Sequence, residues 1–392
     1  MNYDKYINGR AKAIPPSGIR KFFDIVSTMK GAISLGVGEP DFITPWGIRE
    51  AGIRSIRNGY TQYTSNRGLP KLREEIAYYM STRYHVDYSP ENEIIVTVGA
   101  SEAVDIALRT LVDVGDEVLI PDPSYVSYSP CVTLAGGVPV SLHVGAESEF
   151  KLLPEELESK ITGKSKVLFL SYPNNPTGAI MEREYLEKIA EVVKKHDLIV
   201  ITDEIYGELT YDATHVSVAS LPGMRERCVM INGFSKCFAM TGWRIGYVAA
   251  PRELCSAMHK IHQYAIMCAS TASQYAALNA LQTGREDDYA SIREMRDEYD
   301  MRRRFLVGAI RDAGLKCFEP KGAFYVFPSV KELGVTGQEF AEGLLKAKKV
   351  AVVPGDAFGE SGKYHIRCCY AASLKNLTTA CGLIAEYVNE IK

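Results

Sequence analysis

Short apolar runs recur through the middle of this chain, and they limit the possible folds more than any other feature. They cover residues 94–98, 118–121, 167–170, 198–201, 229–231 and 245–249. Most are too short for independent helices and too continuous for half-exposed strands, so they are typical of strands buried on both faces. The pattern therefore predicts a mainly parallel sheet.

Segments with helical periodicity separate several of these runs. In residues 182–196, for example, Leu186, Ile189 and Val193 fall on one helical face. Alternation of strand and helix predicts an α/β fold with helices on both sides of the sheet. Residues 287–313 predict one long helix that leaves this large domain, and residues 316–392 predict a smaller α+β unit.

The expected division of the chain has three parts. A large ligand-binding domain covers residues 46–290, and residues 291–392 form an interdomain helix and the small C-terminal domain. Residues 1–45 form an N-terminal arm that contributes part of the small domain, with residues 15–18 as a non-helical segment.

Charge and cysteine usage exclude several classes of protein. With 45 basic and 48 acidic residues, the net charge of −3 gives no broad field to attract nucleic acid or an anionic membrane. The chain shows no run of about 20 apolar residues, and its nine cysteines form no C-x-x-C pair, so we expect a cytoplasmic protein. His259 and His262 have no accompanying ligand cluster, so we predict a structural role and no metal.

Chemically distinctive residues follow five of the predicted strands. In open α/β sheets, ligands bind beyond the carboxyl ends of the strands. The residues found there are Gly99, Ala100 and Ser101; Tyr125; Asn175 within a turn at 172–178; Asp203 and Tyr206; and Ser235, Lys236 and Arg244.

Each of these residues has an ordinary explanation when it is considered alone. Ser101 can cap a helix over residues 102–112, Tyr125 can pack against its neighbours, and most lysines, Lys236 included, are solvated. Together, however, the strand ends supply a phosphate site at a helix N-terminus, a flat ring, an amide, an acid with a phenol, and a lysine. A pyridoxal ring needs these parts.

Across nearly its whole length the chain resembles the fold-type I enzymes that depend on pyridoxal 5'-phosphate (PLP), specifically the class I and II aminotransferases. The matching stretches are residues 172–178, 203–206, 235–246 and 365–367. The resemblance implies PLP as cofactor and transfer of an amino group from an L-amino acid to a 2-oxo acid such as 2-oxoglutarate. It also implies a homodimer with shared active sites.

The resemblance assigns a role to each matching residue. Lys236 resembles the lysine that holds PLP as a Schiff base and moves the substrate proton, and Asp203 resembles the partner of the pyridine nitrogen. The phosphate ligands correspond to Gly99, Ala100, Ser101, Ser235 and Arg244, and to Tyr63 of the neighbouring subunit. Tyr125 resembles the ring that stacks on the pyridine, and Asn175 and Tyr206 resemble donors to its phenolic oxygen.

Substrate binding involves a second set of residues. Arg367 resembles the arginine that binds the α-carboxylate through two parallel hydrogen bonds, with Asn175 and the backbone of Gly38 nearby. We expect Ile19, in the N-terminal arm, and Tyr63 to line the side-chain pocket.

The motifs leave the substrate open among aromatic amino acids, aspartate and acylated diaminopimelate, the substrates of similar bacterial enzymes. No dedicated second arginine for a distal carboxylate is evident, which disfavours strict aspartate specificity. A PLP-dependent C–S β-lyase of the same fold and a non-enzymatic PLP-sensing domain are the alternatives. The absence of a basic helix-turn-helix segment before residue 30 disfavours the sensing domain.

Overall fold

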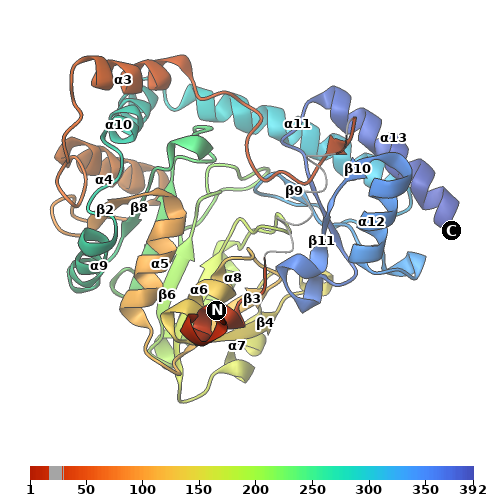
Figure 1. Ribbon diagram of the computed structural model, residues 1–392, viewed down its shortest axis with the longest axis horizontal. Coiled ribbons are helices and arrows are strands. Elements are labelled where there is room, and N and C mark those ends of the chain that lie inside the picture. The colour runs from red at the N-terminus through yellow and green to blue at the C-terminus, as the bar shows by residue number, and fades with distance from the viewer. Residues whose placement is uncertain (17–28, 30) are drawn as a thin grey trace.

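The computed structural model describes residues 1–16, 29 and 31–392. A seven-stranded sheet forms its centre, with strand order β2-β8-β7-β6-β5-β3-β4 (Figure 1). The strands are β2 (Ile94–Thr97), β3 (Glu117–Asp122), β4 (Val138–His143), β5 (Ser165–Ser171), β6 (Ile199–Asp203), β7 (Cys228–Gly233) and β8 (Gly246–Ala249).

All six predicted strands are present, and the sheet is mixed because β8 runs antiparallel to both β2 and β7. The other pairs are parallel. An additional edge strand, β4, pairs with β3 and was not predicted. Several β4 residues are exposed, and the strand contains Pro139, so it lacks the continuous apolar run by which the others were found.

Both faces of the sheet are buried, because successive residues of each central strand point to opposite sides. In β5, Val167 and Phe169 join a core with α5 (Gly99–Leu111), α6 (Tyr128–Ala135) and α9 (Arg252–Ala265). Leu168 and Leu170 join the core on the other face with α4 (Pro70–Tyr84), α8 (Arg183–Lys195) and α10 (Thr271–Glu286). This double burial explains why the strands are continuously apolar.

The other α-helices of the described residues flank the sheet or belong to the C-terminal part. They are α1 (Gly9–Ala13), α3 (Trp46–Arg57), α7 (Pro154–Lys160), α11 (Ala290–Asp312), α12 (Gly337–Lys348) and α13 (Leu374–Ile391). The predicted helices over 182–196 and 287–313 are confirmed as α8 and α11, which begin and end within three residues of the expected bounds. In Figure 1, α11 runs from the side of α10 to α13, so it links the large sheet to the C-terminal part.

The C-terminal part contains a three-stranded antiparallel sheet, in the order β11-β12-β9, packed with α11, α12 and α13. Its strands are β9 (Tyr325–Val326), β11 (Val353–Pro354) and β12 (Ile366–Cys369). Near the N-terminus, β1 (Ile33–Ser34) pairs with β10 (Val350–Ala351). This pairing joins the N-terminal arm to the C-terminal part, and the division of the chain at residues 45 and 290 stays a proposal.

One local prediction is wrong. Helix α5 begins at Gly99, two residues before Ser101, and Ser101 makes no capping hydrogen bond. Gly99 has φ +74°, a left-handed conformation that glycine adopts without strain, so the chain turns directly from β2 into the helix. The Glu102 carboxylate, instead of the serine, accepts a hydrogen bond from the Val98 N–H at 2.5 Å.

Within residues 1–16 and 31–392, no helix is both long enough and apolar enough to cross a lipid bilayer. The nine cysteines all lie in the described part of the chain, and all are free thiols.

Candidate active site

Several of the predicted site residues meet at the carboxyl edge of the large sheet because the central parallel strands end in register. Ser171 at the end of β5 pairs with Asp203 at the end of β6, and Asp203 pairs with Ile231 of β7. The segments that follow these strands therefore leave the sheet side by side. They bring Asn175, Asp203 and Lys236 to one edge, as expected for ligand sites in open α/β sheets.

Asp203 is a buried acid without a charged partner. Its side chain is 5% exposed, and it accepts hydrogen bonds from Tyr128 Oη at 2.9 Å and from the Ile205 N–H at 3.2 Å. No basic side chain of the described residues forms an ion pair with it. Burial therefore raises the pKa of Asp203 to about 6. A cation placed beside this carboxylate would be strongly favoured.

Lys236 lies on the turn after β7, and its amine is partly buried. Its Nζ donates a hydrogen bond to the carbonyl of Gly38 at 2.6 Å and lies 5.7 Å from the centroid of the Tyr206 ring. Burial lowers the pKa of Lys236 to about 8, which increases the fraction of neutral, nucleophilic amine near physiological pH.

The start of α5, together with Arg244, forms a site suited to an anion. The first turn of a helix offers free N–H groups and a partial positive charge. Arg244 packs against this turn so closely that a Cβ on Gly99 would lie 2.6 Å from its Nη2. A Cβ on Gly246 would likewise lie 2.8 Å from the backbone nitrogen of Ala100. Ser235, 8% exposed, directly precedes Lys236 on the β7 turn.

Arg367, on β12, projects from the C-terminal part and is 3% exposed. Its Nη1 donates to Asn175 Oδ1 at 2.8 Å, and its Nη2 donates to the carbonyl of Gly36 at 2.6 Å. Its Nε is buried and has no hydrogen-bond partner among the described residues. Since the planar guanidinium can bind a carboxylate through two parallel bonds, Arg367 is equipped to receive an acidic ligand.

Gly38 lies where no larger residue would fit. A Cβ at this position would be 2.6 Å from the hydroxyl of Tyr325 and 3.7 Å from Arg367 Nη2. Its carbonyl is also the acceptor for Lys236. The structure therefore explains why a glycine stands at residue 38, and the contact of its backbone with a substrate stays a prediction.

The predicted tyrosines differ in how they are placed. Tyr206 is 5% exposed, and its hydroxyl lies 2.8 Å from that of Tyr325. Tyr125 is 37% exposed, with its ring edge-on to Tyr128 at 5.5 Å. Tyr63 is 79% exposed and does not join the other residues within one chain. Ile19 lies outside the described residues.

Sequence reasoning missed Tyr128 and Tyr325. Tyr128 follows Tyr125 by three residues and opens α6, so the aromatic spacing was a usable signal. Tyr325 carried no such signal, because a short apolar strand is ordinary in any core.

The surroundings of His262 support the structural role predicted for it. The ring is fully buried, with Nδ1 2.5 Å from Glu102 Oε1 and Nε2 2.7 Å from the carbonyl of Asn66. It therefore ties α9 to α5 and to the loop that carries Asn66.

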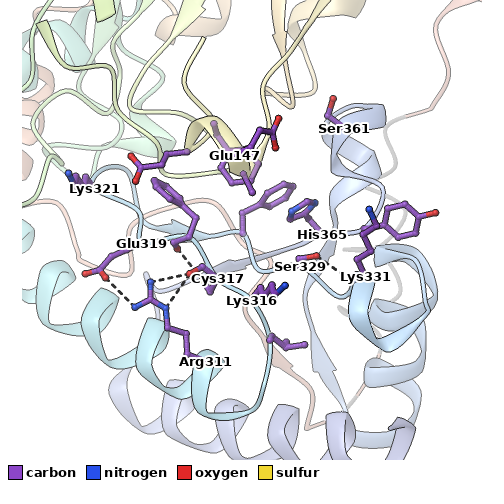
Figure 2. Close-up of a pocket in the computed structure, with 18 of the residues that line it drawn as sticks. Glu147, Arg311, Lys316, Cys317, Glu319, Lys321, Ser329, Lys331, Ser361 and His365 are labelled. Carbon is purple, nitrogen blue, oxygen red and sulfur yellow. Dashed lines mark hydrogen bonds and ion pairs between the residues drawn. The ribbon is translucent and has the colours of Figure 1, made fainter. Parts of the chain in front are cut away.

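A groove of about 1020 Å³ lies elsewhere, between the large sheet and the C-terminal part (Figure 2). Figure 2 shows that Arg311 on its wall is hydrogen-bonded to Glu319 and to the carbonyl of Cys317. His365 stacks on Phe327 with ring centroids 4.9 Å apart. Neither Lys236 nor any other predicted catalytic residue lines this groove, so we do not assign the reaction to it.

The family model and the similar proteins all describe aminotransferases. The family model of "Aminotransferase class I and II" matches residues 30–384. YugH of Bacillus subtilis, whose name assigns an aminotransferase without a substrate, is 53% identical over 375 residues, 96% of each chain. An aspartate aminotransferase of Pyrococcus abyssi is 45% identical over 98% of this chain and 99% of its own. An aromatic-amino-acid aminotransferase of Thermococcus litoralis is 41% identical with the same coverage.

The similar solved structures are aminotransferases as well. The aromatic aminotransferase of Pyrococcus horikoshii superposes with a TM-score of 0.90 at 44% identity, covering 94% of this chain and 99% of its own. The aspartate aminotransferase of Thermus thermophilus with maleate gives a TM-score of 0.93 at 36% identity, covering 97% and 99%.

Proposed function

This chain belongs to the class I and II aminotransferase family and is a PLP-dependent aminotransferase, and on this premise we propose that Lys236 binds the cofactor and that the amino donor is an aromatic L-amino acid. The acceptor is a 2-oxo acid such as 2-oxoglutarate. The observation that carries the site assignment is that the Lys236 amine, the buried Asp203 carboxylate and Arg367 lie together at one edge of the sheet.

The residues present fit PLP. The unpaired Asp203 carboxylate calls for a cation, which the protonated pyridine nitrogen would supply. The first turn of α5 and Arg244 suit a phosphate, and a side chain at Gly99 would collide with Arg244 in this cradle. Lys236, as a primary amine with a lowered pKa, suits an aldehyde.

When bound, PLP supplies an electron sink for the electron pair released as the substrate Cα–H bond breaks. Asp203 keeps a proton on the ring nitrogen by charge pairing, and Tyr206 and Asn175 donate hydrogen bonds to the phenolic oxygen. Arg367 holds the substrate carboxylate, which fixes the direction of the Cα–H bond. Lys236, as a neutral amine held close to the substrate, would be the general base that takes the proton from the substrate Cα and delivers it to C4′ of the cofactor.

The surroundings of Arg367 support the choice of an aromatic donor. Its guanidinium lies 4.4 Å from the centroid of the Tyr325 ring and 4.8 Å from that of Phe358. Among the cationic groups that lower the pKa of Lys236 are Arg367 and Arg244, and both already have a role. Neither is left for a distal carboxylate, whereas a flat apolar side chain can pack on the ring of Phe358. Names of relatives include both aromatic and aspartate enzymes.

We also propose a homodimer with shared sites. Large apolar side chains are exposed along the segment that leads to Tyr63: Ile43 is 76% exposed, Trp46 63% and Tyr63 79%. A second copy covering this segment would bury them and bring its own Tyr63 to the anion site. The cytoplasmic location stays a prediction.

Two measurements test this proposal. Purified protein loaded with PLP is treated with borohydride and digested, and mass spectrometry should find the pyridoxyl group on Lys236. Transamination is then measured with phenylalanine, tyrosine, aspartate and an acylated diaminopimelate against 2-oxoglutarate, pyruvate and oxaloacetate. We expect the highest kcat/KM with the aromatic donors, and loss of at least about 1000-fold in Lys236→Ala.

Lys164→Arg is the control and should retain wild-type rates, because this exposed lysine precedes β5 and lies at the opposite end of that strand from the site. Labelling at another lysine would contradict the cofactor assignment. A clear preference for aspartate would contradict the substrate assignment alone. Release of pyruvate and sulfide from cysteine, without transamination, would instead indicate the β-lyase.

A further inference from the structure

Tyr325 lies inside the site, although no step of the proposed reaction uses it. It is fully buried on β9, where it pairs with Cys369 of β12, two residues from Arg367. Residues two apart in a strand share a face, which places the Tyr325 ring beside Arg367. The guanidinium carbon lies 4.4 Å from the ring centroid.

The Tyr325 hydroxyl occupies a place that the surrounding chain keeps open. It lies 2.8 Å from the Tyr206 hydroxyl, and a Cβ on Gly38 would come within 2.6 Å of it. A glycine at residue 38 is therefore what allows the hydroxyl to reach Tyr206. The ring of Tyr206 is in turn 5.7 Å from Lys236 Nζ, so the pair of hydroxyls borders the reacting groups.

The direction of the hydrogen bond between the two hydroxyls follows from counting protons. Each phenol carries one proton and can donate one hydrogen bond. If Tyr206 donates its one hydrogen bond to the cofactor, its oxygen must accept the hydrogen bond that Tyr325 donates. Burial raises the pKa of both phenols far above neutral, so both remain protonated donors during the reaction.

We propose that Tyr325 is a positioning residue that donates a hydrogen bond to Tyr206 and thereby holds the Tyr206 hydroxyl as a donor to the phenolic oxygen of PLP. This inference rests on the proposed function, which assigns that donor role to Tyr206. Tyr325 itself touches neither the cofactor nor the substrate in this scheme. Its effect must therefore pass through Tyr206.

Tyr325→Phe tests the proposal because it removes the hydroxyl but leaves the ring on Arg367. In the PLP-loaded enzyme, the visible absorbance of the bound cofactor is titrated with pH. A weaker donor stabilises the anionic phenolic oxygen less, so the midpoint should rise by about half to one pH unit. We expect kcat to fall about three- to tenfold, while KM for the amino acid changes less than about twofold.

Tyr211→Phe is the matched control. Tyr211 is 3% exposed in the same hydrophobic core, and its hydroxyl donates to the carbonyl of Ala323 on the segment before β9. That carbonyl also accepts from Tyr370 at 3.1 Å, so it keeps a partner in the variant. This substitution should leave the midpoint of the absorbance titration unchanged.

A double-mutant cycle shows whether Tyr325 acts through Tyr206. Tyr206→Phe should raise the midpoint more than Tyr325→Phe does, and the double variant should match Tyr206→Phe alone. Additive shifts would overturn the proposal, as would an unchanged midpoint in Tyr325→Phe or an equal shift in Tyr211→Phe.

Failure of the underlying function would look different. If wild-type protein carried no pyridoxyl group on Lys236 after borohydride treatment, the cofactor assignment and this inference would both be wrong. If the wild type carries the group and titrates normally, an unshifted Tyr325→Phe refutes the positioning role alone.

Discussion

Replacing Asp203 by asparagine should stabilise the cofactor-free protein and nearly abolish its activity. The carboxylate is buried without a cation, so its charge is unfavourable until the cofactor arrives. Asparagine has nearly the same shape and carries no charge. It therefore removes the cost in the empty site together with the partner of the pyridine nitrogen.

The size of the effect follows from the pKa. Burial raises the pKa of Asp203 from 3.8 to about 6. The folded protein therefore holds this proton more tightly than the unfolded chain does, and stability is lost as pH rises from about 4 to 6. The cost reaches about 3 kcal/mol at pH 8 but only about 1 kcal/mol at pH 4.5.

Asparagine has one acceptor oxygen where Asp203 receives two donors, from Tyr128 and Ile205. Loss of one hydrogen bond costs about 1 kcal/mol. The net gain in the free energy of unfolding should thus be about 2 kcal/mol at pH 8 and close to zero at pH 4.5.

The assay is urea unfolding of PLP-free protein at both pH values, followed by circular dichroism. Asp197→Asn is the control, because that side chain is 90% exposed in an ion pair with Arg227 and should shift stability by less than about 0.5 kcal/mol. With PLP restored, Asp203→Asn should lose at least about 100-fold in kcat/KM. A gain of equal size at both pH values, or none at pH 8, would show that the buried charge is not the cause.

Gly38→Ala should lower kcat/KM at least about tenfold, and adding Tyr325→Phe should recover part of the loss because it removes the colliding oxygen. Gly163→Ala is the control, because a Cβ there faces open space. If the double variant recovers no activity, the clash is not the cause. Subunits carrying Tyr63→Ala and subunits carrying Lys236→Ala should each form weakly active dimers. Mixing equal amounts and reassociating them at random should restore about one quarter of wild-type activity, because half of the dimers are hybrids and each hybrid contains one intact site of two. Activity that stays at the average of the two parents would contradict shared sites.

Much of the fold was predictable because the strands are buried on both faces. Every predicted apolar run is a strand, since double burial leaves a continuous apolar signal in the sequence. The edge strand β4 is partly exposed and gave no such signal. The start of α5 was also misplaced, because the left-handed conformation of Gly99 and the Glu102 carboxylate, rather than a serine cap, set where the helix begins.

The local sequence by itself determined which residue types stand at the strand ends. Asp203, Lys236 and the turn at Asn175 each follow an apolar run within five residues, and parallel strands bring their carboxyl ends to one edge of the sheet. Arg367 was found only through its resemblance to a family motif.

Only the tertiary structure decided how residues distant in sequence meet. Tyr325 reaches Tyr206 across 119 positions, and Arg367 reaches Asn175 across 192. Such contacts depend on how the C-terminal part packs on the sheet edge, and no local periodicity records that packing. The pKa shifts of Lys236 and Asp203 could not be predicted from the sequence either, because they depend on burial by segments that are distant in the chain.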